Sequence, residues 1–250
     1  IQKWMPIDGS VIYENLTNSI GVLVLAGPKS RDILSKITRT DLSNENFPWL
    51  SSKKINVGLA SCIAMRVNFV GELGWELHHP IEYQNHIFDH LMESGKDHGL
   101  KPFGIRAMES LRTEKTYKLV GTEMSIEYAA FESGLDRFIH LNKGNFIGRD
   151  SLVKWQQKGF KNKMVTLEVH DIEDADALGN NPIYSNGEVI GRATGGNYGF
   201  RVKKSLAIAM VDPKFSNIGQ KLEMDILDKK HNVTVIEDSP YDPLNDKLKQ

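Results

Sequence analysis

The stretch FVGELGWELHHP, residues 69–80, joins turn glycines to the apolar–polar alternation typical of a strand. Apolar residues also alternate with polar ones ahead of it, beginning at Met65, while Trp75 and Glu76 follow the glycines. The pattern predicts a β-hairpin whose turn carries Glu72 and whose return strand carries Glu76. It decides how the surrounding residues are interpreted.

Two carboxylates and an indole ring meet in this hairpin, because Glu72 and Glu76 lie four residues apart beside Trp75. A carboxylate can accept two hydrogen bonds from the edge of an aminopyrimidine ring, and a nearby aromatic ring offers a stacking face. An ordinary exposed turn with solvated glutamates fits the same residues.

Strand and helix signals flank the hairpin on both sides. Residues 21–27 (GVLVLAG) form a continuous apolar run that ends before Pro28, and apolar residues then recur at helical spacing. This predicts a buried strand that turns into a helix. Residues 81–98 place their apolar side chains on one helical face, and a further helix is expected over residues 104–115.

The helix expected over residues 104–115 carries an arginine in an apolar setting. Its apolar stripe begins at Ile105, and Arg112 falls seven residues later, almost on the same face. A guanidinium removed from water needs a partner, which is either an internal carboxylate or a ligand. Arg106 lies about 100° around the helix from Ile105, where it projects either into a cavity or into solvent.

A second domain is expected after residue 158, where a basic connector is followed by short strand patterns. The turn signal Asn186-Gly187 lies among them. We predict a small C-terminal β-barrel and a division into residues 1–158 and 159–250. The predicted strands lie near residues 164–170, 188–194, 205–211, 221–227 and 232–236.

Two weaker patterns concern metal and phosphate. His86 and His90 are spaced i, i+4, and His78 adjoins His79, but no HExxH or paired-cysteine motif accompanies them, so no metal site is predicted. The Gly-rich residues 193–199 follow a strand pattern and lack the Lys-Ser/Thr of a phosphate loop. We expect a tight loop at the mouth of the barrel.

Composition narrows the class of protein. The 250 residues carry 31 Lys+Arg against 32 Asp+Glu, so no global basic field attracts nucleic acid. No apolar run approaches the roughly 20 residues that cross a bilayer, and no membrane partner is predicted. The single cysteine, Cys62, is expected in the core of a protein from a reducing compartment. The first residue is Ile1, and we expect further chain upstream.

Several segments together resemble the folate-binding aminomethyltransferase family, which includes the T-protein of the glycine cleavage system. The resemblance is strongest to the C-terminal branch found in dimethylglycine and sarcosine dehydrogenases, and it spans nearly the whole chain. It implies an α+β, folate-binding aminomethyltransferase-like fold that is partial at its N-terminus and is followed by the small barrel. The segments are VLVLAGPKSRDIL (22–34), FVGELGWELHHP (69–80), FGIRAMESLRTEKTYKLVGTEMS (103–125), ESGLDRFIHLNKGNFIGRDSL (132–152) and residues 187–196.

The resemblance implies tetrahydrofolate as the cofactor, with its pteridine ring held by a hairpin glutamate and its glutamate tail facing an arginine. The closing segment SPYDP supplies an aromatic residue that can touch the ligand. The implied folate-binding residues are Glu76 as first choice, Glu72 behind it, Trp75, Arg106 or Arg112 for the tail, and Tyr241.

One departure from the family concerns its essential aspartate, which belongs to a region upstream of this chain. No catalytic residue is therefore assigned here. The related dehydrogenases carry an FAD domain still further upstream, and no GxGxxG occurs in these residues, so FAD is expected only in such a domain. The resemblance implies a methylated amine substrate and a cytoplasmic location, or the mitochondrial matrix in a eukaryote.

The function expected from the resemblance is that of an enzyme portion that captures a one-carbon unit on tetrahydrofolate as 5,10-methylenetetrahydrofolate. On its own, this portion is expected to be inactive in the oxidation. A stand-alone aminomethyltransferase or folate-dependent demethylase is the alternative within the family. A non-catalytic folate-binding module is an alternative of another class. The iron–sulfur assembly relatives carry a cysteine motif where this chain has residues 142–148, which lack cysteine.

Overall fold

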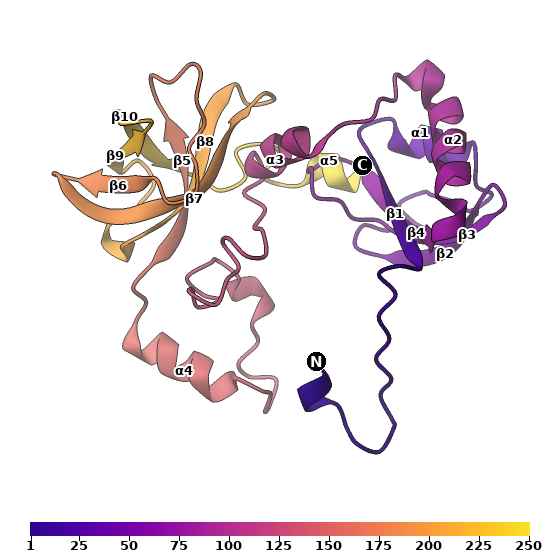
Figure 1. The fold of residues 1–250 in the computed structure, drawn as a ribbon, viewed down its shortest axis with the longest axis horizontal. Coiled ribbons are helices and arrows are strands. Elements are labelled where there is room, and N and C mark those ends of the chain that lie inside the picture. Colours follow the sequence, from indigo (N-terminus) through magenta and orange to yellow (C-terminus); the bar gives the residue numbers. More distant parts are fainter. The chain divides into compact units, whose positions relative to one another are not determined.

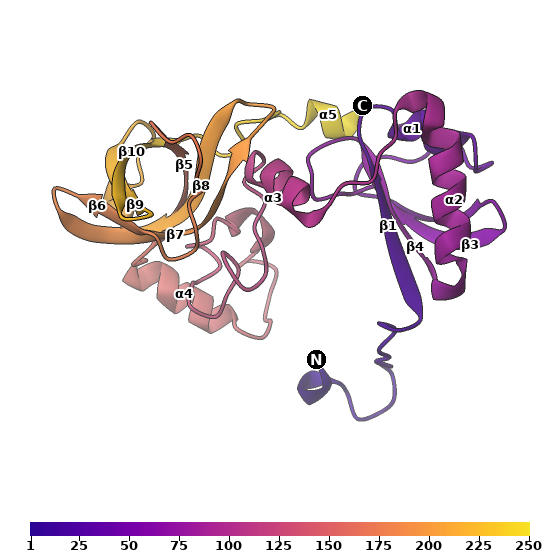
Figure 2. The ribbon, with the colours of Figure 1, turned by 45° about the horizontal axis from the view of Figure 1, so that its top comes forward.

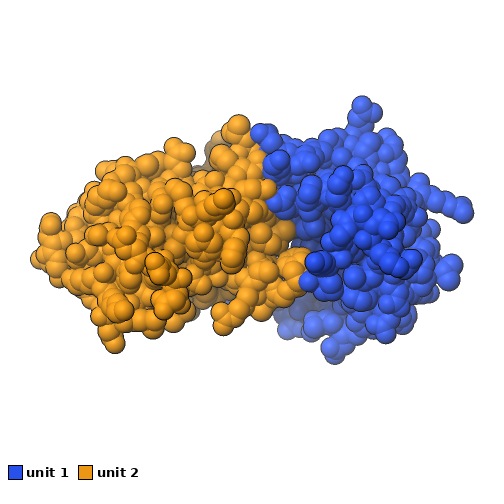
Figure 3. All heavy atoms as spheres, turned by 90° about the horizontal axis from the view of Figure 1, so that it is seen from above, with its two compact units in different colours: residues 1–68, 72–102, 246–250 blue, residues 69–71, 103–245 orange.

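The computed structural model describes all residues from 1 to 250. The chain divides into two compact units, each with its own hydrophobic core, which Figure 3 colours separately. Unit 1 comprises residues 1–68, 72–102 and 246–250, and unit 2 comprises residues 69–71 and 103–245.

Unit 1 is built on an antiparallel four-stranded sheet (Figure 1). In spatial order its strands are β1 (Ile20–Ala26), β4 (Gly74–Pro80), β3 (Ala60–Met65) and β2 (Ser52–Val57). Helix α1 (Ser30–Ser35) packs against β4, and helix α2 (Gln84–Gly95) packs against β1. The remaining short helices of unit 1 are η1 (Gln2–Trp4), η2 (Ile81–Tyr83), η3 (Lys96–His98) and α5 (Asp246–Lys249).

Only one face of this sheet is buried, and the residue alternation along β4 shows why. Trp75 and Leu77 are fully buried in the core, whereas Glu76 between them is half-buried. Successive side chains of a strand point to opposite faces, so β4 separates the core from an open face. Val24 and Ile63 are exposed, and each stands on that open face, opposite Glu76 and His78 in register.

The predicted hairpin is confirmed in its pairing and corrected in its bounds. β3 and β4 pair antiparallel, Glu72 lies in the connecting loop, and Glu76 lies on the return strand. The predicted first strand began at Met65, whereas β3 ends there. Arg66 is buried instead, and its guanidinium donates to the carbonyl oxygen of Phe47 at 2.7 Å. Arg66 is therefore a buried, hydrogen-bonded cation at a position where the alternating pattern predicted a solvent-facing strand residue.

Unit 2 contains a closed six-stranded barrel, and Figure 2 looks into it. The predicted C-terminal barrel is therefore confirmed. The predicted division after residue 158 lies inside unit 2, between helix α4 (Arg149–Lys158) and the first barrel strand. In spatial order the strands are β10 (Lys229–Ile236), β5 (Lys163–Val169), β8 (Lys204–Val211), β7 (Glu188–Gly199), β6 (Pro182–Ser185) and β9 (Lys221–Ile226).

Turn chemistry fixes the hairpin between β6 and β7. Asn186 and Gly187 have φ values of 51° and 82°, the left-handed pair that a two-residue hairpin turn requires. The turn was predicted, but β6 was not, because only four residues beginning with Pro182 form it.

The Gly-rich residues 193–199 are not the tight loop that the sequence suggested, because they continue strand β7 past a bulge. A Cβ at Gly196 would lie 2.6 Å from the carbonyl oxygen of Leu206 on β8. Glycine therefore serves close strand approach here.

The rest of unit 2 precedes or interrupts the barrel. Helix α3 (Ile105–Thr113) packs against β7, and turns dominate the residues from there to α4. The two short helices are η4 (Asp136–Phe138) and η5 (Pro213–Phe215). None of the helices in the structure is both long and apolar enough to cross a membrane.

Cys62 gives the core of unit 1 a measurable pH response. Burial raises the pKa of this thiol from 9.0 to about 11. The neutral thiol stabilises the fold fully below pH 9, and this contribution is lost as the pH rises through 11. We expect the free energy of unfolding to fall by up to about 2–3 kcal/mol over that range. Urea unfolding of wild type and Cys62→Ala measures it, and equal pH slopes in the two proteins would contradict the prediction.

Candidate functional site

Glu76 stands on the open face of the unit 1 sheet, in the middle of β4. Its side chain is 29% exposed, and its carboxylate contacts the Nε2 of His78 at 3.2 Å. His78 is two residues further along the strand and therefore on the same face. The sequence reasoning missed this partner, although the i, i+2 spacing within a strand was the available signal.

The surroundings of Glu76 are mainly apolar. Its strand neighbours in register are Val24 on β1 and Met65 on β3. Val22 and Ile63 flank His78 in the next row and are exposed. A carboxylate has about four lone-pair positions, and His78 takes one of them. The arrangement therefore offers a planar acceptor on an apolar surface.

Glu72 lies in the loop between β3 and β4. Its backbone carbonyl accepts a hydrogen bond from the side-chain amide of Asn68, and its own N–H donates back to Asn68 Oδ1 at 3.5 Å. These bonds fix the loop backbone. Glu72 and Glu76 thus belong to the same unit, one in the loop and one on the strand.

Trp75 is placed in the core rather than beside Glu76. The side chain is fully buried, with the Phe47 ring edge-on at 6.1 Å between centroids. The guanidinium carbons of Arg66 and Arg31 lie 5.8 Å and 5.9 Å from the indole centroid. Its ring offers no free face to a ligand, so the expected stacking role of Trp75 in folate binding is wrong. Adjacent strand residues face opposite ways, which is the physical reason that Trp75 and Glu76 cannot line one surface.

Arg112 forms an internal ion pair, which is one of the two alternatives that the sequence left open for it. It is buried at the end of α3, and its Nε donates to Glu109 Oε2 at 2.7 Å. Its Nη1 donates to the carbonyl oxygen of Tyr117 at 2.8 Å and lies 3.7 Å from the buried carboxylate of Glu123. The protein itself supplies the partners that a buried guanidinium needs.

Arg106 has the opposite environment. It is exposed in the first turn of α3 and makes no hydrogen bond or ion pair. Ile105 beside it is also exposed, so the predicted apolar stripe does not face the core along its whole length. Of the two candidate arginines, Arg106 is the one whose guanidinium stands available to a carboxylate.

Tyr241 belongs to a buried polar cluster of unit 2. The guanidinium carbon of Arg201 lies 3.7 Å from its ring centroid, and its N–H donates to the carbonyl oxygen of Glu114 at 3.0 Å. The Nζ of Lys115 donates to the Tyr241 carbonyl at 3.1 Å. The cation thus covers one face of the ring.

Buried charges were the main feature that sequence reasoning missed. Glu114, Lys115 and Glu123 are all buried in unit 2, next to Arg112 in sequence or in space. The alternation of acidic and basic residues over 109–118 was the available signal, but exposed helices carry the same pattern.

The histidines weighed as a metal site do not form one cluster, although the rings of His86 and His90 lie 4.1 Å apart between centroids. His78 lies on the open sheet face, whereas His79 is buried and bonds to Gln84 at 2.8 Å. His86 Nε2 accepts a hydrogen bond from the N–H of Leu59. No group of three or more metal-ligating side chains gathers anywhere in the structure.

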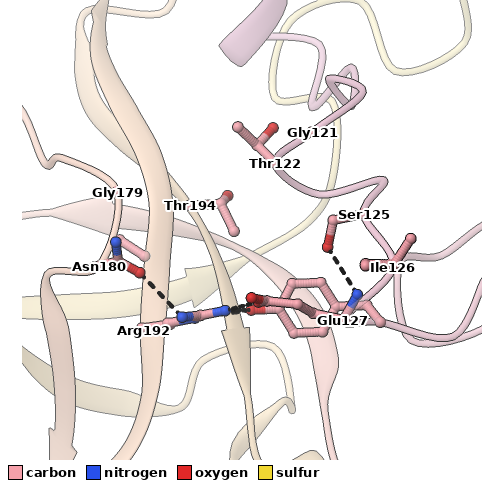
Figure 4. A pocket seen from close by; sticks show the side chains of 11 residues that line it. Gly121, Thr122, Ser125, Ile126, Glu127, Gly179, Asn180, Arg192 and Thr194 are labelled. Carbon is pink, nitrogen blue, oxygen red and sulfur yellow. Dashed lines mark hydrogen bonds and ion pairs between the residues drawn. The ribbon is translucent and has the colours of Figure 1, made fainter.

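A cavity of about 350 Å³ in unit 2 lies between β7 and residues 121–128 (Figure 4). Arg192 is its only cation, and it bonds to Glu127, Asn180 and the Tyr128 hydroxyl. These partners already satisfy the guanidinium. The cavity therefore shows an internal network rather than an open anion site.

Comparison with known families matches most of the chain. Residues 1–143 match the family described as the GCVT N-terminal domain, and residues 162–242 match the glycine cleavage T-protein C-terminal barrel domain. The human dimethylglycine dehydrogenase, a mitochondrial protein, is 38% identical over 229 residues. That match covers 91% of this chain and 26% of the human protein.

Stand-alone proteins match over a similar stretch. The aminomethyltransferase of Thermoanaerobacter pseudethanolicus is 34% identical over 245 residues, covering 96% of this chain and 65% of that protein. The crystal structure of the glycine cleavage system aminomethyltransferase T from Bartonella henselae superposes with a TM-score of 0.79. It is 21% identical, and the match covers 90% of this chain and 60% of that one, which supports the fold. By its family matches and its fold, the chain belongs to the glycine cleavage T-protein (aminomethyltransferase) family.

Proposed function

We propose that this chain is the tetrahydrofolate-binding C-terminal portion of a dimethylglycine or sarcosine dehydrogenase-like enzyme, which captures a one-carbon unit as 5,10-methylenetetrahydrofolate. The observation that carries the proposal is the 38% identity to human dimethylglycine dehydrogenase over 91% of the chain. The chain spans about a quarter of the length of that relative. Activity of the whole enzyme is part of the proposal.

The open sheet face suits the cofactor. Glu76 presents a carboxylate with spare acceptor positions, and Val24 and Met65 flank it with apolar surface. A pteridine ring offers a row of N–H donors and a flat apolar face, so this surface complements it. When bound, tetrahydrofolate supplies the nucleophilic nitrogen that takes up the one-carbon unit. The residues of this chain bind and orient it.

For Arg106 we propose that it binds the glutamate tail of the folate. Its guanidinium is exposed and has no protein partner, unlike that of Arg112. A planar guanidinium binds a carboxylate in a bidentate manner. We assign no proton transfer to any residue of this chain, and oxidation of the methylated amine belongs to a flavin domain upstream.

A stand-alone aminomethyltransferase is the second candidate. The 34% identity to the bacterial aminomethyltransferase, of which the match covers 65%, favours it. The size of the complete gene product separates the two, since a fused oxidase needs a polypeptide at least twice as long as a stand-alone transferase.

Calorimetric titration with tetrahydrofolate under reducing conditions tests the proposal, using the protein expressed from its complete gene. We expect saturable one-to-one binding. A second arm supplies dimethylglycine or sarcosine and follows flavin reduction and formation of 5,10-methylenetetrahydrofolate. Folate binding without amine oxidation would favour the stand-alone transferase. A folded protein that binds no folate would overturn both candidates.

A further inference from the structure

Two adjoining cavities lie in unit 1, beside the edge strand β2 and its neighbour β3. Their volumes are about 570 Å³ and 450 Å³, within the range of small-molecule sites. Thr40 and Asn56 line both of them, so the two cavities adjoin at these residues. The loop after α1 and the turn between β2 and β3 form their walls.

The charge lining these cavities is entirely positive. Lys36, Arg39 and Lys54 contribute three cations, and no aspartate or glutamate lines either cavity. Lys36 donates to the carbonyl oxygen of Ser94 at 3.1 Å, near the C-terminus of α2. The side chains of Arg39 and Lys54 line the cavities and make no ion pair or hydrogen bond within the protein. Unpaired cations around a concave surface favour an anion.

The acid nearest in sequence, Asp41, lines neither cavity. Its carboxylate accepts from the N–H of Ser43 at 2.8 Å and from the side-chain amide of Asn46 at 2.6 Å. These bonds lower the pKa of Asp41 and hold its carboxylate within its own loop. The charged side chains that line the cavities are therefore all cations.

Neutral hydrogen-bonding groups complete the lining. The side chains of Thr40, Asn56 and Ser61 line the cavities and make no hydrogen bond within the protein. His90 donates from Nδ1 to the carbonyl oxygen of His86 at 2.9 Å, which leaves its Nε2 without a protein partner. Hydroxyl and amide groups of this kind bind oxyanions alongside cations.

The wall beneath these groups is fixed by tight packing at Gly58. Its φ of +56° and the approach of His86 exclude a side chain, because a Cβ would lie 2.7 Å from His86 Nε2. The Gly58 N–H donates to the carbonyl oxygen of Ile37 at 3.0 Å. The turn is thereby held between α1 and α2, and the groups around the cavities are positioned before any ligand arrives.

We infer that these cavities bind a small molecule that carries a multivalent oxyanion, either a phosphate ester or a di- or tricarboxylate. Arg39 supplies a planar donor fork, and Lys54 supplies a point charge. The concave shape favours a small molecule over an extended polyanion. Lys54 stands on the same open sheet face as Glu76, with strand β3 between their two strands. The Glu76 surface offers a carboxylate and so selects a different chemistry, and the inference does not rest on folate binding.

Calorimetric titration with inorganic pyrophosphate and, separately, with citrate tests this site at constant ionic strength. We expect saturable one-to-one binding of at least one of them, weakened about tenfold or more in the double variant R39Q/K54Q. The double variant K96Q/K101Q is the control, because it removes the same charge from residues that line neither cavity. It is expected to bind like wild type.

The two ligands distinguish the source of the oxyanion, since pyrophosphate binding indicates a phosphate ester and citrate binding a polycarboxylate. Binding of neither overturns the inference. Equal weakening in R39Q/K54Q and K96Q/K101Q also overturns it, because that result shows a general charge effect. Thermal unfolding of each variant confirms that it is folded.

Discussion

Glu114→Ala is expected to lower the free energy of unfolding of unit 2 by about 3–5 kcal/mol, because it removes the fully buried carboxylate that pairs with Arg201. Glu114 Oε1 accepts from the backbone N–H of Arg201 at 2.6 Å and of Val202 at 3.3 Å, and Oε2 accepts from the Arg201 Nε. The substitution removes one carboxylate that accepts from three donors. It also removes part of the hydrogen bonding between the end of the β7–β8 hairpin and the C-terminal end of α3.

Urea unfolding followed by circular dichroism measures this effect. Glu223→Ala is the matched control, because Glu223 pairs with Lys230 at 3.3 Å on the exposed surface of the barrel. An exposed pair of this kind contributes about 1 kcal/mol or less. Glu114→Gln is expected to fall between the two, since it keeps an acceptor and loses the charge. If Glu114→Ala lowered the free energy of unfolding no more than Glu223→Ala, the buried pair would contribute no more than an exposed one, and the prediction would be wrong.

The sequence left two partners open for Arg112, an internal carboxylate or a ligand. The charged residues at 109, 112 and 114 are compatible with both. Their burial depends on the barrel strand β7 and on residues 117–123, which are far from them in the helical pattern. Local periodicity carries no information about such partners.

The hairpin shows the reverse case, in which local information was sufficient. Glycines and alternation predicted the loop at Glu72 and the strand at Glu76, and both were confirmed. The same period of two already separates Trp75 from Glu76, so the indole could have been placed in the core from the sequence. Trp75 and Glu76 are neighbours in sequence, but on the predicted strand their side chains point to opposite faces.

The barrel was predictable as a whole but not strand by strand. Five strand patterns and the Asn186-Gly187 turn were sufficient for a small barrel. β6 was missed because it is short and begins with Pro182, and the glycines of β7 resembled a loop. Gly196 permits the close approach of Leu206 on β8, a contact that depends on the register between β7 and β8.

Glu76→Gln is expected to weaken tetrahydrofolate binding by about 10- to 100-fold if the open sheet face holds the pteridine. The substitution keeps the size of the side chain and an oxygen that can accept from His78. It removes the charge and replaces one acceptor by an N–H₂ group, which then faces the N–H donors of the ring. Hydrogen bonds to a charged group contribute about 1.5–3 kcal/mol, and the loss of one corresponds to this range of affinity.

Calorimetry on the folded variant separates this role from a structural one. Glu76 is part-exposed and has a single hydrogen-bond partner in the protein, so thermal stability should stay close to that of wild type while affinity falls. Glu93→Gln, on the exposed surface of α2, removes the same charge and should leave affinity unchanged. An unchanged affinity in Glu76→Gln would remove Glu76 from the site. Equal losses in both variants would instead mean that the net charge of unit 1, and no specific carboxylate, governs the approach of the ligand.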